Sequence, residues 1–143
     1  MISTASVQAA IITLLKANAA LVGALYPEGA DEIREEQWMG TDYDYPNVRV
    51  HITRLSPLGD PGSCEDTAFV CDFSAAFRKV NPSSKPSADG LALVVAALVG
   101  EKLSGTGFVA RSAVKLADTV GPIPEAENAW MGRAFFNCRL QET

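Results

Sequence analysis

Few residues in this chain have the type and the setting that catalysis needs. His51 is the only histidine, and it lies in the middle of an alternating segment, on the polar side. A histidine can act as a general base or a metal ligand, but this setting favours a surface side chain. Cys64 follows Gly-Ser in a polar stretch, where a thiol could be exposed and reactive. No histidine is near it in sequence, so an ordinary thiol is favoured unless the fold brings His51 beside it.

Carboxylates occur in two pairs, Glu35-Glu36 and Asp42-Asp44. Glycoside hydrolysis and metal binding need carboxylates that converge from different segments, whereas close neighbours in one segment favour a solvated surface. The chain also lacks a phosphate-binding Gly-rich loop, a Gly-x-Ser-x-Gly motif and a Cys-x-x-Cys motif. We therefore expect a protein that is not an enzyme and that holds neither a metal nor another cofactor.

The three cysteines have no metal-like spacing. Cys71 and Cys138 fall on apolar sides of alternating segments, where cysteine acts as a small hydrophobic residue. An odd number of irregularly spaced cysteines predicts reduced thiols and a cytoplasmic setting. The first residues lack the charged and apolar regions of a signal peptide, and no segment has the character of a membrane span.

The composition is that of one globular domain over residues 1–143. The chain is 48% apolar and 20% charged, which allows a sizeable core and shows no signature of disorder. Its net charge of −5 argues against a nucleic-acid binder, because affinity for phosphate depends on Lys and Arg. An acidic surface would still suit a channel through which DNA passes without sticking.

The element around which we expect the fold to be organised is an apolar helix over 87–103. Pro86 excludes an earlier start, and Ser87 is a suitable N-cap. Such a helix is buried on most of its circumference, or it meets another subunit. Further helices are expected at 4–17 and 19–26. Apolar residues recur at helical spacing along the central helix, at Leu91, Val94, Val95 and Leu98.

Alternation of apolar and polar residues predicts the strands. A weak strand is expected at 31–38, and two prolines make 121–128 a loop. Strands broken by a single helix favour an α+β fold, with a mostly antiparallel sheet of about four to five strands and two main helices packed on one face. The expected order is α-(α)-β-β-β-α-β-β. The longer strands are expected at 47–55, 67–80, 108–119 and 130–141.

The face of this sheet opposite the helices is also partly apolar. A sheet that is apolar on both faces, in a chain with two or three helices, predicts a partner on the second face. The simplest partner is another copy of the chain, and head-to-tail contacts between copies close into rings. The apolar residues on this second face are Ala68, Val70, Ala76, Met131 and Phe135.

Four features together carry a resemblance to a known family. Residues 10–25 read Ala-Ile-Ile-Thr-Leu-Leu-Lys-Ala-Asn-Ala-Ala-Leu-Val-Gly-Ala-Leu within an N-terminal amphipathic region, and a stretch around Ile33 follows. Residues 45–50 read Tyr-Pro-Asn-Val-Arg-Val and enter the first firm strand. A central helix stands between strand pairs, and the chain ends on a strand. In these features the chain resembles the tail terminator, or tail completion, proteins of long-tailed double-stranded DNA bacteriophages.

The resemblance implies a structural role in a virion. Proteins of this family form a homohexameric ring at the head-proximal end of the tail tube, where they end tube polymerisation and take part in head-tail joining. The implied partners are further copies of the chain, the tail tube protein and a head-tail connector or neck protein. DNA would pass through the lumen without specific binding, and assembly would take place in the bacterial cytoplasm without a membrane. Under this reading an acidic lumen would repel the DNA backbone and let it slide.

Neighbours in such a ring are expected to meet through the second sheet face and the loops at its edge. Cations on one subunit would then pair with carboxylates across the junction, although each could also be a solvated charge. The candidate cations are Arg49, His51, Arg78, Arg133 and Arg139. The candidate carboxylates are Glu35, Glu36, Glu125 and Glu127.

Two other functions stay open from the sequence. The chain could be a neck or head-tail connector subunit of the same kind of phage. It could instead be a small α+β enzyme or ligand-binding domain, which predicts a concave pocket with converging polar groups and a shifted pKa. One histidine and scattered carboxylates make this last function the least favoured.

Overall fold

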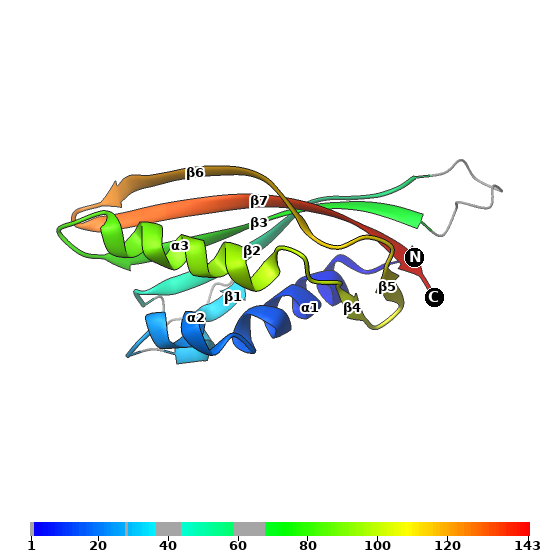
Figure 1. Ribbon diagram of the computed structural model, residues 1–143, viewed down its shortest axis with the longest axis horizontal. Coiled ribbons are helices and arrows are strands. Elements are labelled where there is room, and N and C mark those ends of the chain that lie inside the picture. Colours follow the sequence, from blue (N-terminus) through cyan, green and yellow to red (C-terminus); the bar gives the residue numbers. More distant parts are fainter. Residues whose placement is uncertain (1, 28, 37–43, 59–67) are drawn as a thin grey trace.

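The computed structural model forms one curled sheet with three helices on a single face (Figure 1). It describes residues 2–27, 29–36, 44–58 and 68–143. The helices are α1 (Thr4–Lys16), α2 (Ala19–Ala24) and α3 (Lys85–Leu98), and a 3₁₀ turn, η1 (Gly29–Glu32), follows α2. The strands are β1 (Ile33–Glu35), β2 (Asn47–Pro57), β3 (Ala68–Val80), β4 (Ser104–Gly105), β5 (Phe108–Ala110), β6 (Lys115–Ala126) and β7 (Ala129–Glu142).

The sheet is built around the long antiparallel pair of β3 and β7. The strand order is β1-β2-β3-β7-β5-β4, and β6 pairs with β7 beside β5. The short β1 runs parallel to β2, so the sheet is mixed. Cys71 lies opposite Cys138 and Phe73 opposite Phe136 in the central register. The two phenyl rings stack with centroids 5.1 Å apart, and they help to fill the core beneath the helices.

The expected fold class was wrong in its count of strands and in its element order. The sheet has seven strands rather than four to five, and it curls into a mixed half-barrel. The single strand expected at 108–119 is divided between β5 and β6. The backbone N–H groups of Arg111 and Ser112 both donate to the carbonyl of Arg139, so the chain bends where a regular ladder would continue. A short strand that was not expected, β4, follows the helix and pairs with β5 through a turn at Gly107.

The loop expected at 121–128 is mostly strand. β6 continues to Ala126, and a short turn leads into β7. Pro122 and Pro124 are tolerated because β7 is the only described strand that pairs with β6, so a missing N–H can face away from the ladder. A shift in the register between Val120 and Ile123 accommodates the backbone around Pro122. Proline content alone therefore does not exclude an edge strand.

The N-terminal helices follow the sequence closely. The Ser3 hydroxyl accepts a hydrogen bond from the Ser6 backbone N–H, and α1 buries a stripe of apolar side chains at helical spacing. The Asn18 carboxamide accepts from the Leu21 N–H at 3.0 Å and caps α2. The buried side chains of α1 are Val7, Ile11 and Leu15.

The central helix α3 begins and ends earlier than expected. It starts at Lys85, with Pro86 in the first turn, where the absent N–H would have had no partner. Ser87 is therefore not the cap, and its buried hydroxyl lies 3.3 Å from the Trp130 carbonyl oxygen. The helix ends at Leu98 because the backbone is extended at Val99. No helix among the described residues has the length and hydropathy of a membrane crossing.

Candidate interaction surface on the open sheet face

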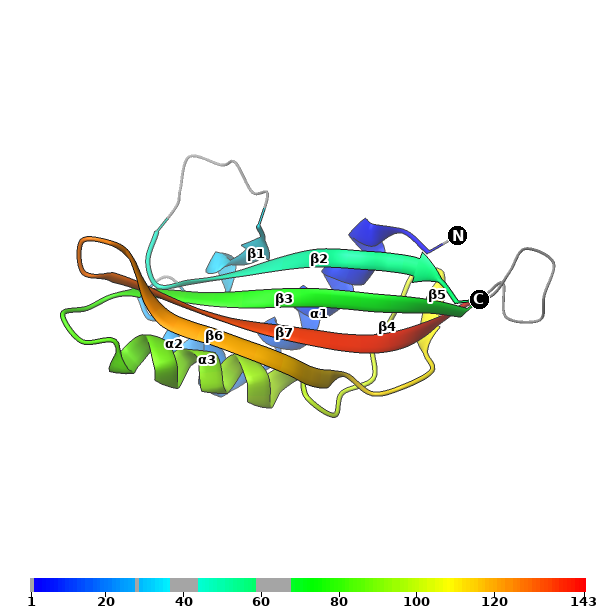
Figure 2. The same cartoon turned by 90° about the horizontal axis from the view of Figure 1, so that it is seen from above.

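The sheet surface turned away from the three helices is the open face. Figure 2 looks onto it, with β2, β3, β7 and β6 in front of the helices. The registers bring its residues into rows across the strands. One row contains Asn47, Arg78, Met131 and Ile123, the next contains Arg49, Ala76, Arg133 and Val120, and the third contains His51, Ser74, Phe135 and Asp118.

Arg49 makes a buried ion pair within the chain. Its side chain is 1% exposed, and Nη2 lies 2.9 Å from Oε1 of Glu32. Nη1 also donates to the Glu32 backbone carbonyl at 2.6 Å. Glu32 ends η1, immediately before β1, so the pair fixes this turn against β2. Arg49 was a candidate for contact with a neighbouring subunit, and Glu32, its actual partner, was not among the candidate carboxylates.

Four of the candidate interface residues meet in one group, here called the Glu36 cluster: Glu36, Arg78, Glu125 and Arg133. Nε of Arg78 donates to Oε2 of Glu125 at 2.9 Å, and Nη2 of Arg78 lies 3.7 Å from Oε1 of Glu36. Arg133 pairs with Glu36 and donates to the Ser74 hydroxyl at 2.9 Å. The cluster joins β3, β6 and β7 to the residue that follows β1. These four residues therefore form ion pairs within a single chain.

The pKa of Glu36 is set by competing effects. Partial burial raises it, but the hydrogen bond and charge of Arg133, followed by the charges of Arg78 and His51, outweigh the burial and hold the pKa below its ordinary value. Glu36 is therefore ionised at neutral pH and stabilises the cations around it. His51 is half-buried on β2 and makes the smallest of these contributions to the pKa of Glu36.

Acidification is expected to weaken the Glu36 cluster. Because the folded-state pKa lies below the ordinary value of 4.5, the stabilisation is present above about pH 4.5 and is lost as the pH falls through the folded-state pKa. Glu36→Gln should lower the free energy of unfolding by about 1 kcal/mol at neutral pH. That difference should shrink when chemical unfolding is followed into acid. Glu35→Gln, at the adjacent position, is the matched control, and a difference for Glu36→Gln that does not change with pH would contradict this account.

The remaining candidates lie apart from this cluster. Glu35 is half-buried at the end of β1, and Glu127 is exposed in the turn between β6 and β7. Arg139 is exposed on β7, near the other end of the sheet. There it lines a hollow of about 300 Å³ with Arg54 and Lys115. Arg54 and Lys115 were not among the candidate residues, because nothing in the sequence indicates that β2, β6 and β7 meet at this end of the sheet.

The edge strand β6 carries exposed apolar side chains. Leu116, Val120 and Ile123 are each 42% exposed. The registers place Val120 and Ile123 on the open face, opposite Arg133 and Met131, while Leu116 lies opposite Phe136 on the helix side. Exposed apolar groups along a strand with one unpaired edge are suited to contact with another protein chain.

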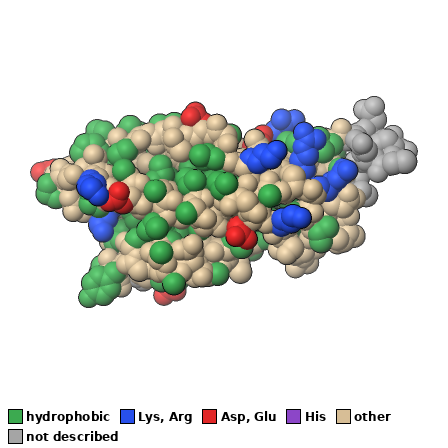
Figure 3. Space-filling view, in the orientation of Figure 1, with side chains coloured by type: hydrophobic (Ala, Val, Ile, Leu, Met, Phe, Trp, Pro, Cys, Tyr) green, Lys and Arg blue, Asp and Glu red, His purple; other side chains and the backbone are tan. Residues whose placement is uncertain are grey.

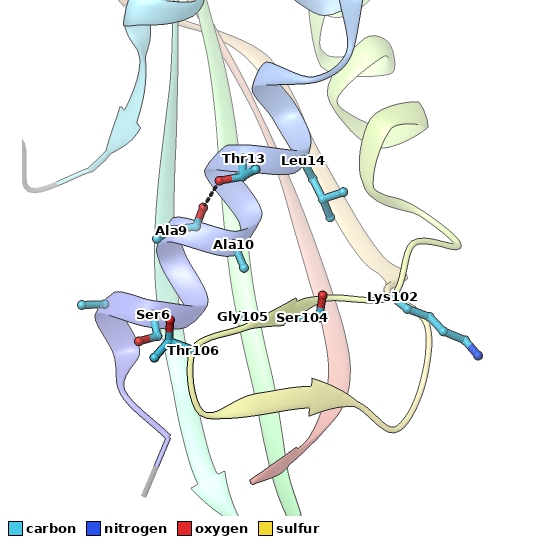
Figure 4. A pocket seen from close by; sticks show the side chains of 10 residues that line it. Ser6, Ala9, Ala10, Thr13, Leu14, Lys102, Ser104, Gly105 and Thr106 are labelled. Atoms are coloured by element: carbon cyan, nitrogen blue, oxygen red, sulfur yellow. Dashed lines mark hydrogen bonds between the residues drawn. The ribbon is translucent and has the colours of Figure 1, made fainter. Parts of the chain in front are cut away.

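A hollow of about 530 Å³ has little chemistry in its lining (Figure 4). It lies between α1 and the β4 turn, and Lys102 supplies its only charged side chain among the described residues. The Thr13 hydroxyl donates to the Ala9 carbonyl at 2.9 Å, which is a bond within α1 rather than a site for a ligand. Its other lining residues are Ala5, Ser6, Ala10, Leu14, Ser104, Gly105 and Thr106.

Those residues considered for chemistry that the structure describes do not assemble into a metal site. Among the described residues, no three His, Cys, Asp or Glu side chains are arranged to hold a metal ion. Cys71 and Cys138 are buried against each other, and their mutual hydrogen bond, with burial, raises the pKa of Cys71 far above its ordinary value. Cys64 and Asp42 lie outside the described residues.

Comparison with solved structures shows a likeness in fold. No protein-family model and no curated protein sequence matches the chain. A chain from the solved virion of a native gene transfer agent (GTA) particle superposes with a TM-score of 0.74. The alignment covers 96% of each chain at 17% sequence identity. The two chains therefore share their fold over almost their whole length.

Proposed function

We propose that this chain is a structural protein of a phage-like virion, and more narrowly a tail terminator. Six copies would form a ring at the head-proximal end of the tail tube, end its polymerisation and offer a surface for head joining. The observation that carries this proposal is the likeness in fold to a chain of a gene transfer agent virion over 96% of both chains. The resemblance of residues 10–25 and 45–50 to tail terminator proteins supports the narrower role.

The surface of the chain is consistent with a role in assembly. Among the described residues, no cluster of His, Cys, Asp and Glu side chains could hold a metal ion, while β6 presents exposed apolar side chains at an edge that pairs with no other described strand. We place the contact between neighbouring subunits along β6 and the adjoining open face. The Glu36 cluster then has a different role from the one first expected, because it holds β6 in position through Glu125. Arg139, Glu35 and Glu127 lie outside that cluster and remain candidates for contact with a neighbouring subunit.

The test of the narrower role is electron microscopy of lysates from the parent phage with this reading frame deleted. We expect free heads beside tails of uncontrolled length, and a return of joined particles when the gene is supplied in trans. Free heads beside tails of normal length would instead assign the chain to the neck. Intact particles in normal number would contradict both assignments.

Charging the β6 edge is expected to block assembly. Val120→Asp combined with Ile123→Asp places two carboxylates where we expect apolar contact with the next subunit, and their burial there would be unfavourable. This double variant, supplied in trans to the deletion phage, should fail to restore joined particles although it folds. The matched control is Val109→Asp on β5, where the valine is 44% exposed. Normal particle yield with the double variant would show that β6 is not the contact.

A further inference from the structure

The hollow at the far end of the open face is lined by cations from three strands. Arg54 comes from β2, Lys115 from the start of β6 and Arg139 from β7. Ser112 and Asn137 add a hydroxyl and a carboxamide to the lining. Figure 3 shows Lys and Arg side chains gathered towards the end of the molecule where the termini lie. This concentration stands out in a chain whose net charge is −5.

The positive charge of the hollow is only weakly neutralised. Asp72 is the one carboxylate in the lining, and it lies 4.0 Å from Nη1 of Arg54, with both side chains well exposed. Within the described ranges, the Lys115 ammonium and the Arg139 guanidinium make no ion pair or hydrogen bond, although the Arg139 backbone N–H donates to the Ser112 hydroxyl. Such cations keep their counterions until an anionic partner displaces them. The Glu36 cluster differs, because there the arginines are already paired.

We propose that the hollow lined by Arg54, Lys115 and Arg139 contacts the phosphate backbone of double-stranded DNA. The lining supports this partner over an acidic protein surface. Protein interfaces take most of their affinity from apolar anchors in dry pockets, and this hollow offers only the half-buried Val70 and the buried Cys138. Contacts to phosphate need no apolar anchor, and they are made by Arg, Lys, hydroxyl and amide groups, all of which are present.

The contact is expected to be weak and independent of base sequence. A few cations in an otherwise acidic chain hold a passing duplex through counterion release alone, and the acidic surroundings limit the affinity. Each subunit would present one positively charged hollow to the DNA, whereas a uniformly acidic channel would present none. The proposal rests on the proposed function only for the source of the DNA. Tail length after gene deletion tests the terminator role, and DNA binding by the purified protein tests this hollow, so either can fail alone.

The test measures binding of the purified protein to a fluorescently labelled 30-base-pair duplex by anisotropy over a series of salt concentrations. With three phosphate contacts, log Kd should change with log salt with a slope of about 3. Lys115→Gln combined with Arg139→Gln should reduce that slope by about 2 and should weaken binding to unrelated duplex sequences equally. Lys16→Gln combined with Lys85→Gln removes the same net charge from helix ends and should leave the slope unchanged.

Each other outcome overturns the proposal. Absence of binding at the lowest salt would exclude DNA as the partner. Equal slopes for both double variants would show that the hollow contributes no more than net charge. Polyglutamate that competes as effectively as unlabelled duplex, at equal anionic charge, would assign the hollow to an acidic protein surface. Circular dichroism of both double variants checks that the folds are the same.

Discussion

Replacing Arg49 by methionine is expected to lower the free energy of unfolding by about 3–5 kcal/mol. Methionine has a similar length and keeps the apolar contacts of the side chain, so the main loss is charge and hydrogen bonding. Glu32 is 3% exposed and would be left with a buried carboxylate that has lost its 2.9 Å partner. The Glu32 backbone carbonyl would also lose the donor that lies 2.6 Å away. Chemical unfolding at neutral pH measures the effect.

The control for this prediction uses the other arginine near the same carboxylate. Nη2 of Arg34 lies 3.8 Å from Oε2 of Glu32, and the Arg34 side chain is 25% exposed. Arg34→Met should therefore cost less than about 1 kcal/mol. Arg49→Met combined with Glu32→Gln removes the buried charge and should recover part of the loss. A loss below about 1 kcal/mol for Arg49→Met alone would mean that the pair does not fix η1 against β2.

The position of Arg49 in its strand was predictable from the sequence, but its burial was not. Alternation correctly placed it on the polar side of β2, opposite Val48 and Val50. A polar side of a strand is usually solvated, so the arginine was expected at a surface. The structure buries it because η1 carries Glu32 over this end of the sheet. The residues around Arg49 do not specify where η1 lies, because its position depends on the parallel pairing of β1 with β2.

The long strands were predicted more clearly than the short ones. β1 lies within the weak strand expected at 31–38, β5 lies at the start of the strand expected at 108–119, and β4 was not expected. Period-two alternation identified β2, β3 and β7 because their side chains alternate between the core and the open face over many residues. The two- and three-residue strands β1, β4 and β5 are too short to show a period. β6 was only partly predicted because its prolines are acceptable at an edge.

The charged residues of the candidate surface were identified, but their pairing was not. Opposite charges on a polar face can pair within one chain or across a subunit boundary, and the sequence pattern is the same in both cases. Glu36 follows β1 and Glu125 lies near the end of β6. The sheet places both side chains beside Arg78. Their distances in sequence from Arg78 gave no sign of this proximity. The basic hollow was missed for the same reason.

Gly90→Ala is expected to lower the free energy of unfolding by about 2 kcal/mol, although alanine is the better helix former. A Cβ at Gly90 would overlap with the Phe77 ring, far inside van der Waals contact. Phe77 is 1% exposed, so its ring has no free space into which to move. Overpacking of this kind costs about 3 kcal/mol, and the gain of about 1 kcal/mol in helix propensity offsets part of it. Thermal or chemical unfolding measures the net effect.

The same substitution in α2 separates these two contributions. Gly23 has no atom within 4 Å of an added Cβ, and its φ is not in the left-handed region. Gly23→Ala should therefore stabilise the protein by about 0.5–1 kcal/mol. If alanine lowers the free energy of unfolding at Gly90 and raises it at Gly23, then Gly90 is required for the close approach of α3 to β3. Stabilisation by both would mean that Phe77 and the helix can separate at little cost, and that the seating of α3 on the sheet is looser than the contact at Gly90 indicates.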